Sequence, residues 1–185
     1  ACTGYAASGD RVRVHFEDGP DEEGDVLIGA DGIHSVVRHQ LLGEAPTRYA
    51  GYTCWRGVVD IEGLWDPRLS GEHWGRGTRF GLTCIGGGKL YWFAVADAPE
   101  GEVHPEPKAA CTERFADWCE SIRRIIAATP AEAVLHSDII DRPPVKRWGE
   151  GRVTLLGDAA HATTPNLGQG ACLAIEDAVV LAARL

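Results

Sequence analysis

Two aspartates stand beside glycines, each directly after a short apolar run. Asp31 follows "DVLIGA" and precedes Gly32, and Asp158 follows "RVTLLG", which ends in Gly157. A short continuous apolar run is typical of a strand buried on both faces, and ligands of α/β sheets bind outside the carboxyl ends of such strands. A carboxylate there can accept hydrogen bonds from sugar or ribityl hydroxyls. The alternative for each aspartate is a helix N-cap, which needs no ligand.

The loop "TTPNLGQG" (Thr163–Gly170) follows the second aspartate. Gly168 and Gly170 would let the backbone approach a flat ligand closely, and Pro165 stiffens the entry. A helix is predicted from Gly168, with its positive end and free N–H groups directed at the loop. The alternative is a tight turn before a packed helix. The apolar stripe that predicts this helix comprises Ala171, Ala174, Ile175, Ala178, Val179, Ala182 and Leu185.

The rest of the chain predicts the elements that must position these groups. Alternation in "DRVRVHFEDG" indicates a half-buried strand, and "IHSVVRHQLLG" indicates a helix ended by Gly43. Residues 49–97 are rich in β-branched and aromatic side chains and predict a mostly antiparallel sheet, with a hairpin at "GGGK" (Gly86–Lys89). Residues 108–129 predict one amphipathic helix.

Composition limits the classes of function. The 185 residues carry a net charge of −9, which argues against a nucleic-acid partner. No apolar run approaches the ~20 residues that span a bilayer. The six cysteines form no C-x-x-C pair and do not join the histidines at zinc-ligand spacing, so we predict free thiols, a reducing, cytoplasmic compartment and no metal site. The acid-rich "EDGPDEEGD" predicts a solvated hairpin or loop.

Two long motifs resemble those of a known family. "DVLIGADGIHSVVR" resembles the DG motif, and "GRVTLLGDAAHATTPNLGQGACLAIEDA" the GD motif, of FAD-dependent aromatic hydroxylases, the class A flavoprotein monooxygenases. "YAGYTCWRGVV", "WGRGTRFGL" and "KLYWFA" are similar to the branch with zeaxanthin epoxidase, FAD-dependent urate hydroxylase and salicylate-type hydroxylases. The resemblance implies an α/β fold of the para-hydroxybenzoate hydroxylase type. Residues 1–45 and 148–185 would be parts of a Rossmann-like FAD domain, and residues 46–147 an inserted substrate domain.

The resemblance also assigns roles to the residues of the two motifs. Asp158 would bind the ribityl chain of FAD, and the loop before the last helix would line the isoalloxazine ring. Asp31 and Arg38 would lie near the pyrophosphate and the path of NADPH or NADH. The implied cofactor-binding set comprises Asp31, Gly32, Arg38, Gly157, Asp158, Pro165, Gly168, Gln169 and Gly170.

Arg79 and Tyr91 are the candidates for the catalytic site. They stand on the predicted strands on either side of the "GGGK" turn, where relatives similar to urate hydroxylase place an arginine and a tyrosine facing substrate. An arginine can hold an anionic substrate and a phenol can orient a hydroxyl. The alternatives are a surface arginine and a core tyrosine. His161 is interpreted as a structural histidine. Tryptophans at 55, 74 and 92 are interpreted as core residues or as walls of an aromatic pocket.

The implied activity is an NAD(P)H-using monooxygenase, either a hydroxylase or an epoxidase. It would pass one oxygen atom of O2, through a flavin C4a-hydroperoxide, to a small aromatic or polyene-like substrate. Alternatives are a reductase or halogenase on the same fold, or a cofactor-free folding or interaction module. The family's G-x-G-x-x-G motif is not found in this sequence. The stretch "GRGTRFG" is no substitute for it, because its spacing is wrong and it lies in the predicted sheet segment. We therefore expect a fragment that is inactive alone and whose upstream sequence carries that motif.

Overall fold

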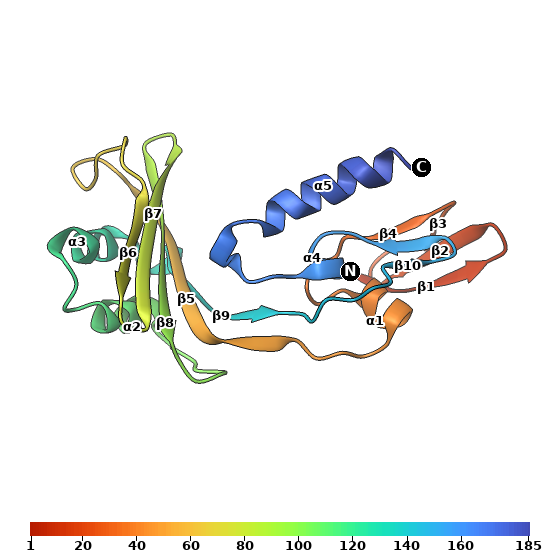
Figure 1. Ribbon diagram of the computed structural model, residues 1–185, viewed down its shortest axis with the longest axis horizontal. Helices are drawn as coiled ribbons and strands as arrows, with labels where there is room; N and C mark the ends of the chain where they lie inside the picture. The colour runs from red at the N-terminus through yellow and green to blue at the C-terminus, as the bar shows by residue number, and fades with distance from the viewer. The chain divides into compact units, whose positions relative to one another are not determined.

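The computed structural model describes residues 1–185 as two compact units (Figure 1). Unit 1 combines residues Ala1–Arg48 with Ile140–Leu185, and unit 2 is the continuous segment Tyr49–Ile139. None of the helices combines the length and apolar character needed to cross a membrane.

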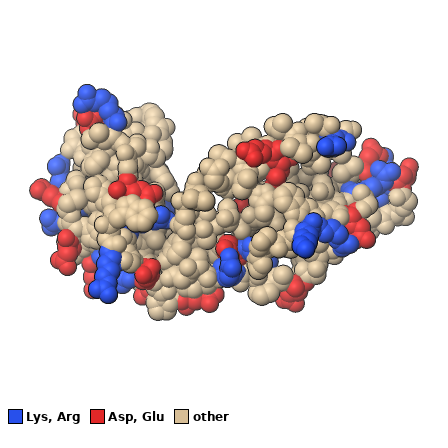
Figure 2. Space-filling view, in the orientation of Figure 1, with Lys and Arg blue, Asp and Glu red and all other residues tan.

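An antiparallel sheet at one end of unit 1 consists of three strands, in the order β1 (Cys2–Ser8), β2 (Arg11–Phe16) and β3 (Glu22–Gly24). Val12 is buried as the alternation predicts, whereas Phe16 is 38% exposed. The acid-rich segment supplies β3, and its carboxylates pair with arginines of β2, as Arg13 does with Glu23. Acidic and basic side chains accordingly interleave over this end of unit 1 (Figure 2).

A second sheet of unit 1 holds the strands that end at the two aspartates. Its order is β10 (Gly149–Glu150), β11 (Val153–Leu155) and β4 (Leu27–Gly29), and β11 pairs with β4 in parallel. Because Leu155 pairs with Gly29, both strands end at the same edge. The prediction that this strand is buried on both faces was wrong for β4, because Ile28 is 40% exposed. The helix α1 (Val36–Leu42) packs so closely that a side chain at Gly29 would meet Val37 at 2.8 Å.

Unit 2 is built on a five-stranded sheet with the order β6-β7-β8-β5-β9. The predicted hairpin is present, because β7 and β8 pair in antiparallel fashion around Gly87 and Gly88, whose φ angles are 57° and 69°. Glycine adopts these positive φ angles without steric cost, as two-residue hairpin turns require. The strands are β5 (Arg48–Asp60), β6 (Gly71–Gly75), β7 (Thr78–Gly86), β8 (Lys89–Asp97) and β9 (Leu135–Asp141).

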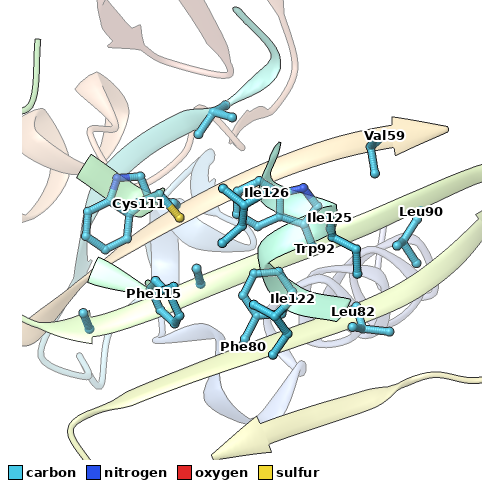
Figure 3. Close-up of a cluster of buried hydrophobic side chains, with 14 residues drawn as sticks. Val59, Phe80, Leu82, Leu90, Trp92, Cys111, Phe115, Ile122, Ile125 and Ile126 are labelled. Atoms are coloured by element: carbon cyan, nitrogen blue, oxygen red, sulfur yellow. The ribbon is translucent and has the colours of Figure 1, made fainter. Parts of the chain in front are cut away.

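Two helices, α2 (Pro107–Arg114) and α3 (Glu120–Ala128), cover one face of this sheet (Figure 1). Trp92 is fully buried beneath them, stacks on Phe80 at 5.4 Å and donates a 2.9 Å hydrogen bond from Nε1 to Thr129 Oγ1. A side chain at Gly57 would meet the Trp92 ring at 2.7 Å, so glycine is what lets the indole lie flat on β5. The surrounding core is aliphatic and aromatic (Figure 3).

The single helix predicted over residues 108–129 is wrong. The chain leaves helical geometry at Phe115 (φ −109°, ψ 19°) and starts again after Cys119 (φ −57°, ψ 154°). Phe115 and Trp118 pack within the break, with ring centroids 5.1 Å apart. Tertiary packing of these two rings onto the sheet overrides a periodicity that local sequence alone would continue.

The closing segment contains α4 (Asp158–His161), a 3₁₀ turn at Pro165–Leu167 and α5 (Gly170–Ala182). The predicted helix is confirmed, although it begins at Gly170 rather than at Gly168. Its apolar stripe is not buried in this structure, since Ile175 and Val179 are each 66% exposed.

Candidate functional site

A cleft of about 510 Å³ lies in unit 1 at the carboxyl ends of β4 and β11. The parallel register of the two strands delivers both sequence motifs to it. Six of the nine predicted cofactor residues line the cleft, namely Gly32, Gly157, Asp158, Pro165, Gly168 and Gly170. Asp31, Arg38 and Gln169 are not among its lining residues.

The wall of the cleft depends on glycine backbone geometry. Gly157 has φ 60° and ψ −137°, a conformation that L side chains rarely adopt, and a Cβ there would lie 3.1 Å from Cβ of Ala174. Gly168 ends the 3₁₀ turn in the left-handed region at φ 63°. The chain can therefore turn twice around the cleft without placing a side chain in it.

Asp158 is the exposed first residue of α4 and lines the cleft. The N-terminal residues of α5, Gly170 and Ala171, line it as well. A helix of 13 residues carries free N–H groups and a partial positive charge at this end. The cleft thus offers a carboxylate acceptor together with N–H donors, a combination suited to a ligand with hydroxyls at one part and developing negative charge at another.

Asp31 makes the hydrogen bonds of a helix cap. Its Oδ2 accepts from the backbone N–H of Val36 at 2.8 Å and of Val37 at 3.3 Å, and its Oδ1 accepts from Ser35 Oγ at 2.5 Å. Ser35 Oγ in turn accepts from the N–H of Arg38 at 2.8 Å. Ser35 is thus the N-cap of α1, and Asp31 adds to it by accepting the N–H groups of the first helical residues; the role of Asp31 toward a ligand stays a prediction.

Arg38 is 4% exposed and bonded to protein rather than directed at the cleft. Its Nη1 donates to the carbonyl oxygens of Ala159 at 2.9 Å and Ala160 at 2.8 Å, which ties α1 to α4. Burial lowers the pKa of the guanidinium, with a smaller contribution from the charge of Arg142. Arg38 therefore has a structural role in joining α1 to α4, and its predicted position near the pyrophosphate stays a prediction.

Asp177 of α5 is a site residue that the sequence analysis missed. Its Oδ2 accepts a 3.0 Å hydrogen bond from the Gly157 N–H and lies 2.6 Å from His161 Nε2. The imidazole also packs on Trp148, with ring centroids 5.0 Å apart. His161 therefore has the structural role expected of it, and Asp177 holds α5 against the turn that carries Asp158. A detectable signal was its position three residues after Ala174, on the same helix face.

Arg79 and Tyr91 lie on one face of the unit 2 sheet, opposite the core in Figure 3. The Arg79 side chain is 14% exposed, its Nη1 lies 3.6 Å from Glu72, and its guanidinium carbon lies 5.7 Å from the ring centroids of both Trp74 and Phe93. Tyr91 is half-buried beside Phe93 at 6.3 Å. Burial raises the pKa of Tyr91, as does Cys54, whereas Arg56 lowers it.

The three tryptophans separate into two groups. Trp55 and Trp92 are core residues, 2% and 0% exposed, while Trp74 is 77% exposed and stacks beside Arg79. Cys84 packs partly against the core from β7. Of these three tryptophans, Trp74 is the exposed one, and it lies beside Arg79.

The fold and the cleft together match a known family. The model of the family described as FAD binding domain matches residues 3–185. The chain belongs to this family, within the class A flavoprotein monooxygenases, and has the para-hydroxybenzoate hydroxylase fold. The resemblance stated from the two sequence motifs is thereby confirmed.

Two curated relatives show how near the chain is to characterised proteins. It is 49% identical over 180 residues to aurachin C monooxygenase/isomerase of Stigmatella aurantiaca and 44% identical over 185 residues to chloroplastic zeaxanthin epoxidase of Nicotiana plumbaginifolia. These matches cover 97% and 98% of this chain. The chain spans 47% and 28% of the length of the two relatives.

Among solved structures, HpxO of Klebsiella pneumoniae in complex with FAD and uric acid superposes with a TM-score of 0.92 at 40% identity. The match covers 98% of this chain and 48% of HpxO. The residues that line the cleft fit a flavin. The backbone turns at glycines, the one acidic side chain is exposed, and a helix N-terminus borders the cleft.

Proposed function

We propose that the chain is part of a monooxygenase that uses FAD and NADPH or NADH. The enzyme inserts one oxygen atom of O2 into a small aromatic or electron-rich substrate, as a hydroxylase or an epoxidase. The observation that carries this proposal is the gathering of six motif residues around one cleft at the ends of two parallel strands. The monooxygenase names of the relatives support it.

Each part of the cleft has a role in this proposal. Asp158 accepts hydrogen bonds from the ribityl hydroxyls, and the backbone at Pro165 and Gly168–Gly170, including Gln169, borders the flavin ring. The N-terminus of α5 stabilises negative charge on the reduced ring. When bound, FAD supplies the hydride acceptance and oxygen activation that protein side chains lack.

Unit 2 provides the substrate-binding face in this proposal. Arg79 and Tyr91 orient the substrate, with the arginine held between two aromatic rings and the phenol beside Phe93. We also propose a cytoplasmic location, which the six free thiols support.

The proposed function can be tested with the full-length protein. FAD titration, oxidation of NADPH and NADH, and oxygen consumption are measured with a panel of ring substrates, and mass spectrometry under ¹⁸O2 detects the incorporated atom. The proposal requires one labelled oxygen per product. Pyridine-nucleotide oxidation without labelled product would instead indicate a reductase, and a halogenated product in the presence of halide would indicate a halogenase. A protein that binds no FAD would be a cofactor-free module.

A further inference from the structure

Asp177 lies on the face of α5 that borders the cleft, although it is not a lining residue of the cleft itself. Ala174 follows Gly170 by four residues and Asp177 follows Ala174 by three, so all three lie on one face of the helix. Gly170 and Ala174 line the cleft, and the Asp177 side chain, 18% exposed, comes next along that face. A largely buried acidic group is therefore placed directly beside the proposed cofactor site.

Asp177 serves two hydrogen-bond donors through one carboxylate oxygen. Its Oδ2 accepts from the backbone N–H of Gly157 at 3.0 Å and lies 2.6 Å from Nε2 of His161. Because a carboxylate can only accept, Nε2 of His161 is the donor. The other ring nitrogen, Nδ1, is buried without a partner, so the imidazole is oriented by its bond to Asp177. One oxygen atom of α5 therefore holds both ends of the segment Gly157–His161, which contains Asp158.

The contact between α5 and this turn is close. A Cβ at Gly157 would lie 3.1 Å from Cβ of Ala174, so the helix and the backbone of the turn meet there. Gly157 adopts φ 60° and ψ −137°, and the residue after it, Asp158, lines the cleft. The bond from the Gly157 N–H to Asp177 fixes the peptide group at the point where the chain turns toward the cleft. The position of the Asp158 carboxylate thus depends on how α5 packs against the turn.

Two groups of the cleft bind the cofactor electrostatically in the proposed function, and α5 supplies one of them. The Asp158 carboxylate accepts hydrogen bonds from hydroxyls, while the N-terminus of α5 presents free N–H groups and a partial positive charge. A ligand that contacts both groups binds more tightly when their separation is fixed beforehand, because less entropy is lost on binding. Asp177 joins the helix that carries one group to the turn that carries the other.

We propose that Asp177 is a positioning residue for FAD, which sets the place of the Asp158 carboxylate relative to the N-terminus of α5 without contacting the cofactor. The inference rests on the proposed function and adds to it a residue that acts through another. Its geometry uses a single acceptor oxygen, so the negative charge of Asp177 is not what the cofactor requires. An amide of the same shape should therefore replace the carboxylate, whereas a side chain without an acceptor should not.

The test uses the full-length protein and compares FAD affinity in two backgrounds, the wild type and Asp158→Ala. Asp177→Asn and Asp177→Ala are made in both, because asparagine keeps an acceptor oxygen at the same place and alanine keeps none. Glu176→Ala is the matched control, since Glu176 is the exposed acidic neighbour on the same helix. Fluorescence titration of the apoprotein with FAD gives the dissociation constants, and circular dichroism gives the melting temperature of each apoprotein.

In the wild-type background, Asp177→Ala should weaken FAD binding roughly 10- to 100-fold, because the Asp158 carboxylate loses its fixed position. Asp177→Asn and Glu176→Ala should each stay within about threefold of the wild type. In the Asp158→Ala background, Asp177→Ala should weaken binding by at most about threefold more, since the group that it positions is already absent. Such non-additivity distinguishes a residue that acts through Asp158 from one that merely stabilises the fold.

His161→Phe covers the case in which Asp177→Ala does not fold. Phenylalanine keeps a ring against Trp148 but removes the donor to Asp177. FAD binding should therefore weaken by roughly 3- to 10-fold in the wild-type background, and by less in the Asp158→Ala background. Unchanged FAD affinity in this variant would overturn the inference.

Three results with Asp177 would overturn it as well: wild-type FAD affinity in Asp177→Ala, an equal loss in both backgrounds, or a loss in Asp177→Asn as large as in Asp177→Ala. A wild-type protein that binds no FAD overturns the proposed function and this inference together. One that binds FAD with the expected coupling but yields no labelled product overturns the proposed function alone.

Discussion

At the scale of single residues, the two motif aspartates have different surroundings although their sequence settings are alike. Asp31 is engaged by the backbone N–H groups of Val36 and Val37, whereas Asp158 is exposed and lines the cleft. The first stabilises α1, and the second is available to a ligand. Substitution of Asp158 is therefore the sharper test of cofactor binding.

In the full-length protein, Asp158→Ala should weaken FAD binding by about 1–3 kcal/mol, or roughly one to two decades, because a ribityl hydroxyl loses its acceptor in a closed site. The apoprotein should melt within a few degrees of the wild type, since even a carboxylate that caps a helix contributes only ~1 kcal/mol. Asp18→Ala, an exposed aspartate of the acid-rich segment, is the control. An apoprotein that melts much earlier with FAD affinity unchanged would make Asp158 a structural cap.

The cysteines should differ in reactivity with pH. Burial raises the pKa of Cys54 to about 11 and of Cys111 to about 12, while a hydrogen bond from Ser121 lowers that of the exposed Cys119. Iodoacetamide at pH 8, read by mass spectrometry, should modify Cys119 first. The folded pKa of Cys54 lies above the unfolded value, so its stabilising effect is complete below pH 9 and is lost as pH rises through 11. Early labelling of Cys54 in folded protein would contradict this.

At the scale of elements, the turn between β11 and α4 is held by contacts distant in sequence. Gly157 needs its positive φ, Asp177 accepts its N–H at 3.0 Å, and Arg38 binds the carbonyls of α4. Side chains of two distant segments, α1 and α5, thus bind the backbone of Gly157, Ala159 and Ala160. The turn should be rigid before any ligand arrives, which lowers the entropy lost on binding.

Gly157→Ala should lower the free energy of unfolding by about 1–3 kcal/mol, because alanine is strained at this φ and its Cβ would crowd Ala174. Gly151→Ala is the matched control: its φ is 57°, with no atom within 4 Å of the added Cβ. Denaturant unfolding and FAD titration separate the two effects. Backbone strain at positive φ should lower the free energy of unfolding of both variants, but only Gly157→Ala should also weaken FAD binding. Equal FAD affinity in both would remove Gly157 from the site.

At the scale of the whole molecule, the two units differ in continuity. Unit 2 is one segment with its own core, whereas unit 1 is assembled from both ends of the chain. Residues 46–147 expressed alone should therefore fold cooperatively, as dispersed amide NMR signals and a sigmoidal melt would show, without binding FAD. Phe80→Ala should cost about 3–5 kcal/mol in this piece, because Phe80 is fully buried against Trp92. A wild-type piece without a cooperative melt would show that unit 2 depends on unit 1.

The sequence by itself determined the local elements and the family. Neighbouring residues alone were enough to interpret the alternation at Val12, the glycines of the hairpin and the two strand-end aspartates. Strand period and turn chemistry are local properties of the sequence. The motifs were long enough to identify the family without a structure.

Only the tertiary structure decided which of these residues meet and which are already engaged. It ended the helix at Phe115, turned Arg38 toward the carbonyls of α4 and brought in Asp177. Each of these outcomes depends on atoms supplied by segments distant in sequence. Hydrogen-bond partners and counter-charges are set by proximity in space, which side-chain type and spacing along the chain do not encode.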